Sequence, residues 1–174
     1  MDIEKMISKE EIEERIINLS YELNEYYKNE EVVIICILKG ALIFTADLVR
    51  HLKMPLSIEF LKASSYRDKT YSDGIVEVKS DIKQSLNGKN ILVIDDIIDT
   101  GYTLEKVINI LKQDNPKSIK LCTLFNKQER REVSISADFY GFDIPNEFII
   151  GYGLDYDEKY RNLPYIGKVK QIKK

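Results

Sequence analysis

Residues that mark several common functional sites are scarce in this sequence of 174 residues. Its two cysteines, Cys36 and Cys122, stand in apolar runs and form no Cys-x-x-Cys motif, so we expect two reduced thiols in the core. The one histidine, His51, lacks partners for a Ser–His–Asp or Cys–His set, and we interpret it as structural. The sequence also contains neither G-x-x-x-x-G-K-[ST] nor G-x-G-x-x-G, which argues against ATP-binding loops and dinucleotide folds.

An excess of positive charge and a long hydrophobic run are absent as well. The 29 acidic and 26 basic side chains give a net charge of −3, which argues against a broad basic face for nucleic acid or anionic lipid. The longest apolar run, Val32–Leu38, is far shorter than the ~20 residues that span a bilayer. The first residues show no secretory signal, so we expect a cytoplasmic protein without nucleic-acid or membrane partners.

The hydrophobic pattern predicts a single α/β domain over residues 1–174. Ser8 and Glu11 form a capping-box signature, and apolar residues then recur at helical spacing from Ile12 to Leu23. Apolar, strand-like runs alternate with helical patterns further along, which indicates a mostly parallel twisted sheet with helices on both faces. We expect strands at 32–38, 56–61, 91–94, 118–125 and 148–150, and helices after Gly40 and after Gly101.

The segment 62–84 is polar and rich in turn-forming residues, and it is too long for a connector in a compact domain. We therefore predict a mobile lid loop there, with Ser65 and Tyr66 facing the ligand.

Three aspartates lie within five residues directly after the apolar run 91–94. Asp95 and Asp96 cannot both enter the core unpaired, because an unpaired buried charge is very costly, so at least one is expected to face a cleft. Residues 100–103 then offer hydroxyl groups and amides where a helix begins, which is typical of a phosphate cradle. A phosphate cradle beside paired carboxylates indicates a phosphorylated sugar, since carboxylates accept hydrogen bonds from adjacent hydroxyls.

Segment 91–101, ILVIDDIIDTG, resembles the phosphoribosyl pyrophosphate motif of type I phosphoribosyltransferases, and within them those that act on hypoxanthine and guanine. The resemblance spans nearly the whole chain, with further matching segments at 38–40, 64–66, 126–127 with Arg131, 141–145, Phe148, 151–156 and 160–167. It departs at Asp95, where many relatives carry Glu. The resemblance implies that family's fold, with a small hood and a mobile lid.

The implied reaction transfers the 5-phosphoribosyl group of phosphoribosyl pyrophosphate to a 6-oxopurine, giving IMP or GMP and pyrophosphate. Asp99 would be the general base, and Asp95 and Asp96 would hold the ribose hydroxyls. Mg²⁺ on the pyrophosphate would contact Asp95, Asp96 or Asp155, directly or through water. The remaining substrate-binding residues that the resemblance implies are Lys39, Gly40, Ile98, Thr100, Gly101, Tyr102, Thr103, Lys127, Phe148, Ile149 and Arg161.

Purine selection would depend on Lys127, which donates to the 6-oxo group, and on Phe148, which stacks on the ring. Adenine would be rejected because its 6-amino group cannot accept that hydrogen bond. Arg131 would support the pyrophosphate or the neighbouring loop, and we expect Arg130 to face solvent. The resemblance also implies a homodimer or homotetramer.

Two other functions are opposed by the sequence. A nucleic-acid-binding regulator on the same fold is opposed by the acidic net charge and by the presence of Asp99. A phosphatase-like hydrolase needs an Asp-x-Asp motif near a strand end, whereas these aspartates are spaced one and three residues apart.

Overall fold

A six-stranded sheet lies at the centre of the part of the chain that the computed structural model describes, residues 2–66, 75–80 and 82–171. Its strands run in the order β4-β3-β2-β5-β6-β7, and every neighbouring pair is parallel except β3 and β4. The strands are β2 (Val32–Leu38), β3 (Leu56–Tyr66), β4 (Ile75–Ser80), β5 (Asn90–Ile98), β6 (Ser118–Asn126) and β7 (Phe139–Asp143). The predicted mostly parallel sheet is confirmed.

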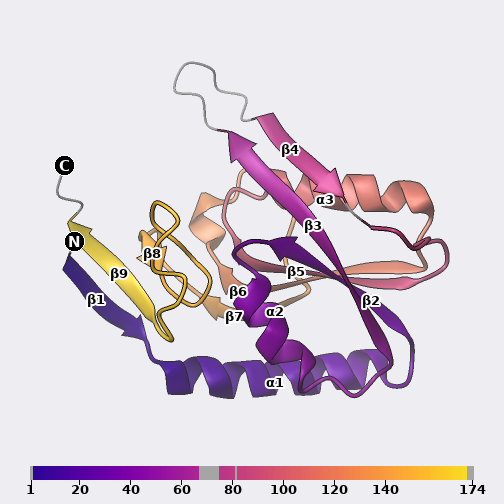
Figure 1. Cartoon of the computed structure of the whole chain (residues 1–174), viewed down its shortest axis with the longest axis horizontal. Helices are drawn as coiled ribbons and strands as arrows, with labels where there is room; N and C mark the ends of the chain where they lie inside the picture. Colours follow the sequence, from indigo (N-terminus) through magenta and orange to yellow (C-terminus); the bar gives the residue numbers. More distant parts are fainter. Residues whose placement is uncertain (1, 67–74, 81, 172–174) are drawn as a thin grey trace.

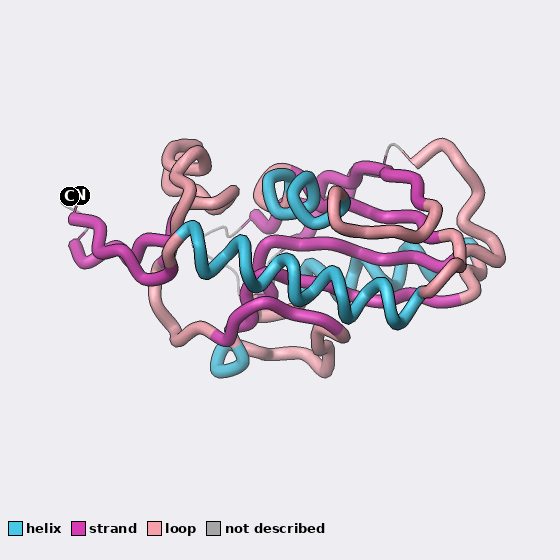
Figure 2. The backbone as a smooth tube through the Cα atoms, turned by 90° about the horizontal axis from the view of Figure 1, so that it is seen from below, coloured by secondary structure: helices cyan, strands magenta, loops and turns pink. Residues whose placement is uncertain are grey.

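Helices cover both faces of this sheet, as expected (Figures 1 and 2). Helices α1 (Lys9–Tyr27) and α2 (Leu42–Val49) pack on one face, and α3 (Tyr102–Leu111), which continues into the short helix η1 (Lys112–Asp114), packs on the other. The capping box of α1 is formed, because Glu11 N–H donates to Ser8 Oγ at 3.2 Å and Ser8 N–H donates to Glu11 Oε2 at 2.7 Å.

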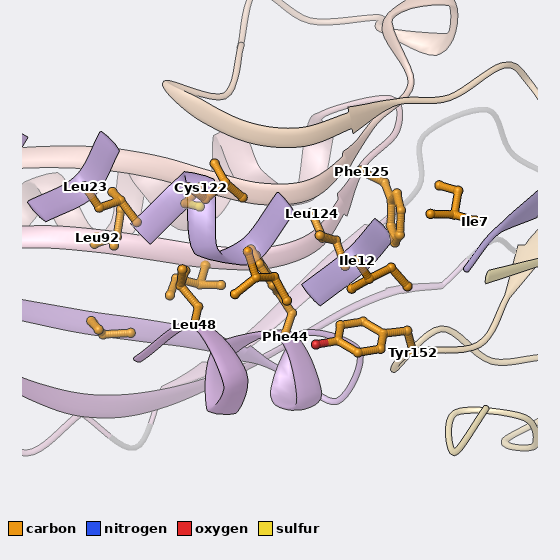
Figure 3. Close-up of a cluster of buried hydrophobic side chains, with 14 of the residues drawn as sticks. Ile7, Ile12, Leu23, Phe44, Leu48, Leu92, Cys122, Leu124, Phe125 and Tyr152 are labelled. Carbon is orange, nitrogen blue, oxygen red and sulfur yellow. The ribbon is translucent and has the colours of Figure 1, made fainter. Parts of the chain in front are cut away.

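The central strands are buried on both sides because α1 and α2 accept alternate side chains from one face and α3 accepts the others. Figure 3 shows the larger cluster, in which Phe44 and Leu48 of α2 meet Leu92 of β5 and Leu124 of β6. Cys36 and Cys122 are both buried free thiols, as predicted, and burial raises the pKa of each.

A second sheet of three strands stands at one end of the molecule, built from β1 (Asp2–Ile7), β9 (Ile166–Gln171) and β8 (Ile149–Ile150) (Figure 1). The strand expected at 148–150 therefore exists, but it pairs antiparallel with β9 and is not part of the parallel sheet. We refer to this sheet, together with the loop 151–165, as the hood. Since β1 pairs along β9, the two ends of the described chain lie side by side there (Figure 2).

The segment 62–84 contains more regular structure than the expected loop. Residues up to Tyr66 continue β3, and β4 pairs with them antiparallel from Ser80 back to Ile75. The connection 67–74 lies outside the described residues, as do the side chains of Ser65 and Tyr66, so the lid and their contacts stay predictions. Among the described residues, no helix combines the length and apolar character that crossing a membrane requires.

Candidate active site

A cavity of about 390 Å³ opens at the carboxyl ends of β2 and β5. Ligands of open parallel sheets bind at this edge, because the strand ends and the loops that follow them converge there. We call it the first cavity, and ten of the predicted site residues line it: Lys39, Gly40, Asp95, Asp96, Asp99, Thr100, Gly101, Thr103, Asp155 and Arg161. Segments far apart in the sequence are thus brought together at one site.

Asp95 and Asp96 line the first cavity from within β5, since this strand continues to Ile98 instead of ending at residue 94. Asp95 Oδ1 accepts a hydrogen bond of 2.9 Å from the Asp96 amide, and Asp96 Oδ1 accepts one of 2.8 Å from the Ile97 amide. Burial and the charge of Asp96 raise the pKa of Asp95, and burial raises the pKa of Asp96. The two carboxylates are therefore held beside each other at an energetic cost.

The Asp96 carboxylate lies directly against the backbone of Gly40. A methyl group at Gly40 would come within 1.7 Å of Asp96 Oδ2, so only glycine leaves room for this approach. The peptide bond between Leu38 and Lys39, just before it, is cis.

The expected phosphate cradle follows Asp99. Gly101 takes the left-handed conformation at φ 96° and caps the N-terminus of α3, where the first amides of a helix have no acceptor within the helix. Thr100, Gly101 and Thr103 line the first cavity. Two other predicted residues do not: Tyr102 is about half exposed, and Ile98 belongs to the core beneath α3.

Two cations that line the first cavity, Lys39 and Arg161, are joined by acidic side chains. Arg161 Nη2 lies 2.8 Å from Asp155 Oδ1 and 3.5 Å from Glu158 Oε1, and its Nη1 donates to the Gly153 carbonyl at 2.7 Å. Lys39 Nζ lies 2.7 Å from Glu158 Oε2. Glu158 is not among the predicted site residues, because a glutamate in a charged turn is more often only solvated.

A second cavity of about 450 Å³ adjoins the first and contains the predicted purine-selecting residues Lys127, Phe148 and Ile149. Lys127 Nζ donates to the Glu147 carbonyl at 2.8 Å, and burial lowers the pKa of Lys127. Phe148 is 46% exposed and makes a T-shaped contact with the Tyr156 ring at a centroid distance of 5.8 Å, so the two rings are not stacked face to face. The cavity thus offers a cation and an exposed aromatic ring for a planar ligand.

Asp99 stands where the two cavities meet, since Ile97, Asp99 and Asp155 line both. Arg130 Nε lies 2.7 Å from Asp99 Oδ1, and Arg130 also lines the second cavity. The expectation that Arg130 faces solvent is therefore wrong. The short helix η2 (Gln128–Arg130), which follows β6, turns this side chain back toward the loop after β5.

Arg131 holds the same loop from behind. Its Nε donates to the Asp99 carbonyl at 3.0 Å, and its Nη2 donates to Asn126 Oδ1 at 2.8 Å. This supports the expected role beside the loop, and Arg131 is not among the residues that line either cavity.

The three carboxylates expected at a metal all line the first cavity, but they do not form a metal cluster by themselves. Among the residues described, no three His, Cys, Asp or Glu side chains are grouped so that they could hold an ion. This donor set fits Mg²⁺, which commonly binds through one or two carboxylates, several waters and the oxygens of a phosphorylated ligand. It does not fit an ion enclosed by protein ligands alone.

Comparisons with known proteins agree with this geometry. The model of a family described as the phosphoribosyl transferase domain matches residues 5–157. A hypoxanthine phosphoribosyltransferase of Buchnera aphidicola is 46% identical over 169 residues, which cover 96% of each chain. A hypoxanthine-guanine phosphoribosyltransferase of Bacillus subtilis is 46% identical over 170 residues, 97% of this chain and 94% of the relative.

A solved structure is similar over the same length. The crystal structure of a hypoxanthine-guanine phosphoribosyltransferase from Bacillus anthracis aligns with a TM-score of 0.89 and 42% identity, covering 97% of this chain and 99% of the other. The similarity thus extends over nearly the whole chain.

Proposed function

The chain belongs to the phosphoribosyltransferase family, and we infer from this membership and its site that it transfers the 5-phosphoribosyl group of phosphoribosyl pyrophosphate to hypoxanthine and guanine. It is a pentosyltransferase of purine salvage, and its products are IMP or GMP with pyrophosphate. The observation that carries this function is the meeting of two cavities at Asp99: the first has phosphate- and sugar-binding groups, and the second has a cation and an aromatic ring.

The activated sugar occupies the first cavity in this proposal. The carboxylates of Asp95 and Asp96 accept hydrogen bonds from the ribose hydroxyls, and the cradle at residues 100–103 holds the 5′-phosphate through backbone amides and threonine hydroxyls. Lys39 and Arg161, which line the same cavity, hold the pyrophosphate. Their positive charges favour departure of the leaving group, on which negative charge grows as the glycosidic bond breaks.

The purine occupies the second cavity, stacked on Phe148 and with its 6-oxo group facing Lys127. Asp99 takes the proton from the imidazole nitrogen of the purine as the purine forms its bond to the anomeric carbon and the bond from that carbon to pyrophosphate breaks. Its position between the cavities supports this role, because a general base must lie within hydrogen-bond reach of the proton that it removes.

We propose Mg²⁺ as the cofactor. Such an ion would supply positive charge that neutralises the leaving pyrophosphate. Asp95, Asp96 and Asp155 are the residues that would contact it, directly or through water.

A nucleobase panel tests this function. The purified protein with Mg²⁺ and phosphoribosyl pyrophosphate is given hypoxanthine, guanine, adenine or uracil, and pyrophosphate release is measured. We expect turnover with the two 6-oxopurines and none with adenine or uracil. Turnover of adenine at equal efficiency would contradict the role of Lys127, and no turnover with any base would contradict the function.

We further propose a cytoplasmic location and a homodimeric or homotetrameric state. Size-exclusion chromatography with light scattering would measure the oligomeric state.

A further inference from the structure

The carboxylate of Glu158 bridges Lys39 and Arg161, the two cations of the first cavity that are proposed to hold pyrophosphate. Its Oε2 lies 2.7 Å from Lys39 Nζ, and its Oε1 lies 3.5 Å from Arg161 Nη2. Lys39 follows β2, whereas Glu158 and Arg161 lie in the hood, so the Lys39–Glu158 ion pair joins two separate parts of the fold. Each oxygen of the carboxylate therefore contacts one of the groups proposed to hold pyrophosphate.

The backbone around Glu158 places this carboxylate. The Glu158 amide donates to Asp155 Oδ2 at 2.9 Å, and residues 157 and 158 both adopt the left-handed conformation, with φ of 53° and 59°. Tyr156 and Lys159 close the turn through two backbone hydrogen bonds of 3.1 Å. Because residues other than glycine rarely adopt the left-handed conformation twice in succession, this turn has a defined shape that presents Glu158 to Lys39.

We propose that Glu158 is an internal anion, which occupies Lys39 and Arg161 in the free enzyme and is displaced by the pyrophosphate group of the substrate. The proposal rests on the function proposed above. A carboxylate and a phosphate offer the same kind of oxygen to the same donors, so both cannot hold Lys39 and Arg161 fully at once. Glu158 would keep the two cations near their working positions while no substrate is bound.

The exposure of the Lys39–Glu158 ion pair makes the displacement possible. Lys39 and Glu158 are 63% and 65% exposed in their side chains, and exposed pairs are weak because water screens them. Competition of this strength lowers the apparent affinity for pyrophosphate by about 2- to 5-fold. The effect acts on pyrophosphate and on the activated sugar, and it leaves the purine in the second cavity unaffected.

Glu158→Gln tests the proposal because it removes the charge and keeps the shape of the side chain. Asp157→Asn is the matched control: it removes the same charge from the adjacent residue of the same turn, and Asp157 is 80% exposed and pairs with Lys159 at 3.8 Å. Binding of inorganic pyrophosphate with Mg²⁺ is measured by isothermal titration calorimetry, and KM is measured separately for phosphoribosyl pyrophosphate and for hypoxanthine.

We expect Glu158→Gln to bind pyrophosphate about 2- to 5-fold more tightly and to lower KM for phosphoribosyl pyrophosphate, with KM for hypoxanthine unchanged. Asp157→Asn should bind pyrophosphate like the wild type. Equal affinities in the two variants would overturn the proposal, as would weaker binding by Glu158→Gln, which would mean that the carboxylate only organises the cations. A wild type that binds pyrophosphate but forms no nucleotide would instead contradict the proposed function.

Discussion

Replacing Asp99 with asparagine removes the proposed general base and keeps the shape of the side chain. The amide cannot take a proton from the purine, and general-base catalysis contributes about 10²- to 10⁴-fold in rate. This corresponds to about 3–5 kcal/mol in the activation free energy. The hydroxyl and phosphate contacts of the activated sugar involve other residues, so its binding should change little.

The substitution also breaks the ion pair with Arg130, and the structure limits the size of that second effect. The side chains of Arg130 and Asp99 are 31% and 35% exposed, so the loss of the pair costs about 0.2–1 kcal/mol of stability. The loss of the base therefore has the larger effect. Arg130→Gln separates the two effects, because it removes the ion pair and leaves the carboxylate in place.

The assay is single-turnover formation of IMP, with enzyme in excess over substrate, combined with calorimetric binding of phosphoribosyl pyrophosphate. We expect Asp99→Asn to be slower by at least about 100-fold, with affinity for the sugar within a factor of about three, and Arg130→Gln to remain close to the wild type. An Asp99→Asn rate within about threefold of the wild type, with chemistry shown to be limiting, would refute the assignment. A loss of the same size in Arg130→Gln would assign the effect to the ion pair.

Three further substitutions test other parts of the site. Lys127→Gln should lower kcat/KM for hypoxanthine by about 10- to 100-fold and should reduce the ratio of kcat/KM for hypoxanthine to kcat/KM for adenine. If that ratio is unchanged, Lys127 does not contact the 6-oxo group. Asp95→Asn should weaken binding of the activated sugar but raise stability at pH 7 by about 1 kcal/mol, which is about 2–4 °C in Tm. The sign of this stability change follows from the pKa of Asp95, which is raised in the folded state. The protonated carboxyl therefore stabilises the fold at pH values below the pKa of the unfolded chain, near 3.8, and this stabilisation is lost as the pH rises. The stability advantage of Asp95→Asn over the wild type should thus be smaller in melts near pH 4 than at pH 7. Gly153→Ala should raise KM for phosphoribosyl pyrophosphate by about 10-fold and lower Tm, because its Cβ would lie 2.1 Å from the Gly40 carbonyl at φ 100°. Gly88→Ala is the control for backbone strain alone, since Gly88 has φ 69° and no described atom lies within 4 Å of the added Cβ. An equal loss of Tm with unchanged KM in both variants would show that the approach of Gly153 to Gly40 does not affect substrate binding.

The central sheet and the acidic segment could be predicted because their signals are local. A continuous β-branched run such as Val32–Leu38 indicates a strand buried on both faces, and the capping box at Ser8 marks where α1 begins. The adjacent carboxylates of Asp95 and Asp96 indicate a cleft by the cost of burying charge, and both do line the first cavity.

The strand β5 is longer than its apolar run predicts, for a physical reason. Aspartate is rare in strands, so the sequence predicts that the strand ends at residue 94. In the structure, Asp95 pairs with Thr123 and Ile97 pairs with Phe125 of β6, and this pairing extends β5 to Ile98. The carboxylates therefore project from a rigid strand instead of a loop, which holds them in a fixed position for the sugar.

The residue types in short segments of the sequence were enough to predict the four central parallel strands, the helices on both faces of the sheet and the acidic segment after Ile94, but not the edge strands β4 and β7. The predictions of Lys39, Lys127, Phe148, Asp155 and Arg161 as site residues depended on the family resemblance. Only the tertiary structure decided that β1 closes the hood by pairing with β9, that Arg130 turns toward Asp99, and that Glu158 joins Lys39 to Arg161. The physical reason is range: propensity and periodicity act over a few residues, whereas these pairings depend on the direction in which each strand and turn leaves the folded core.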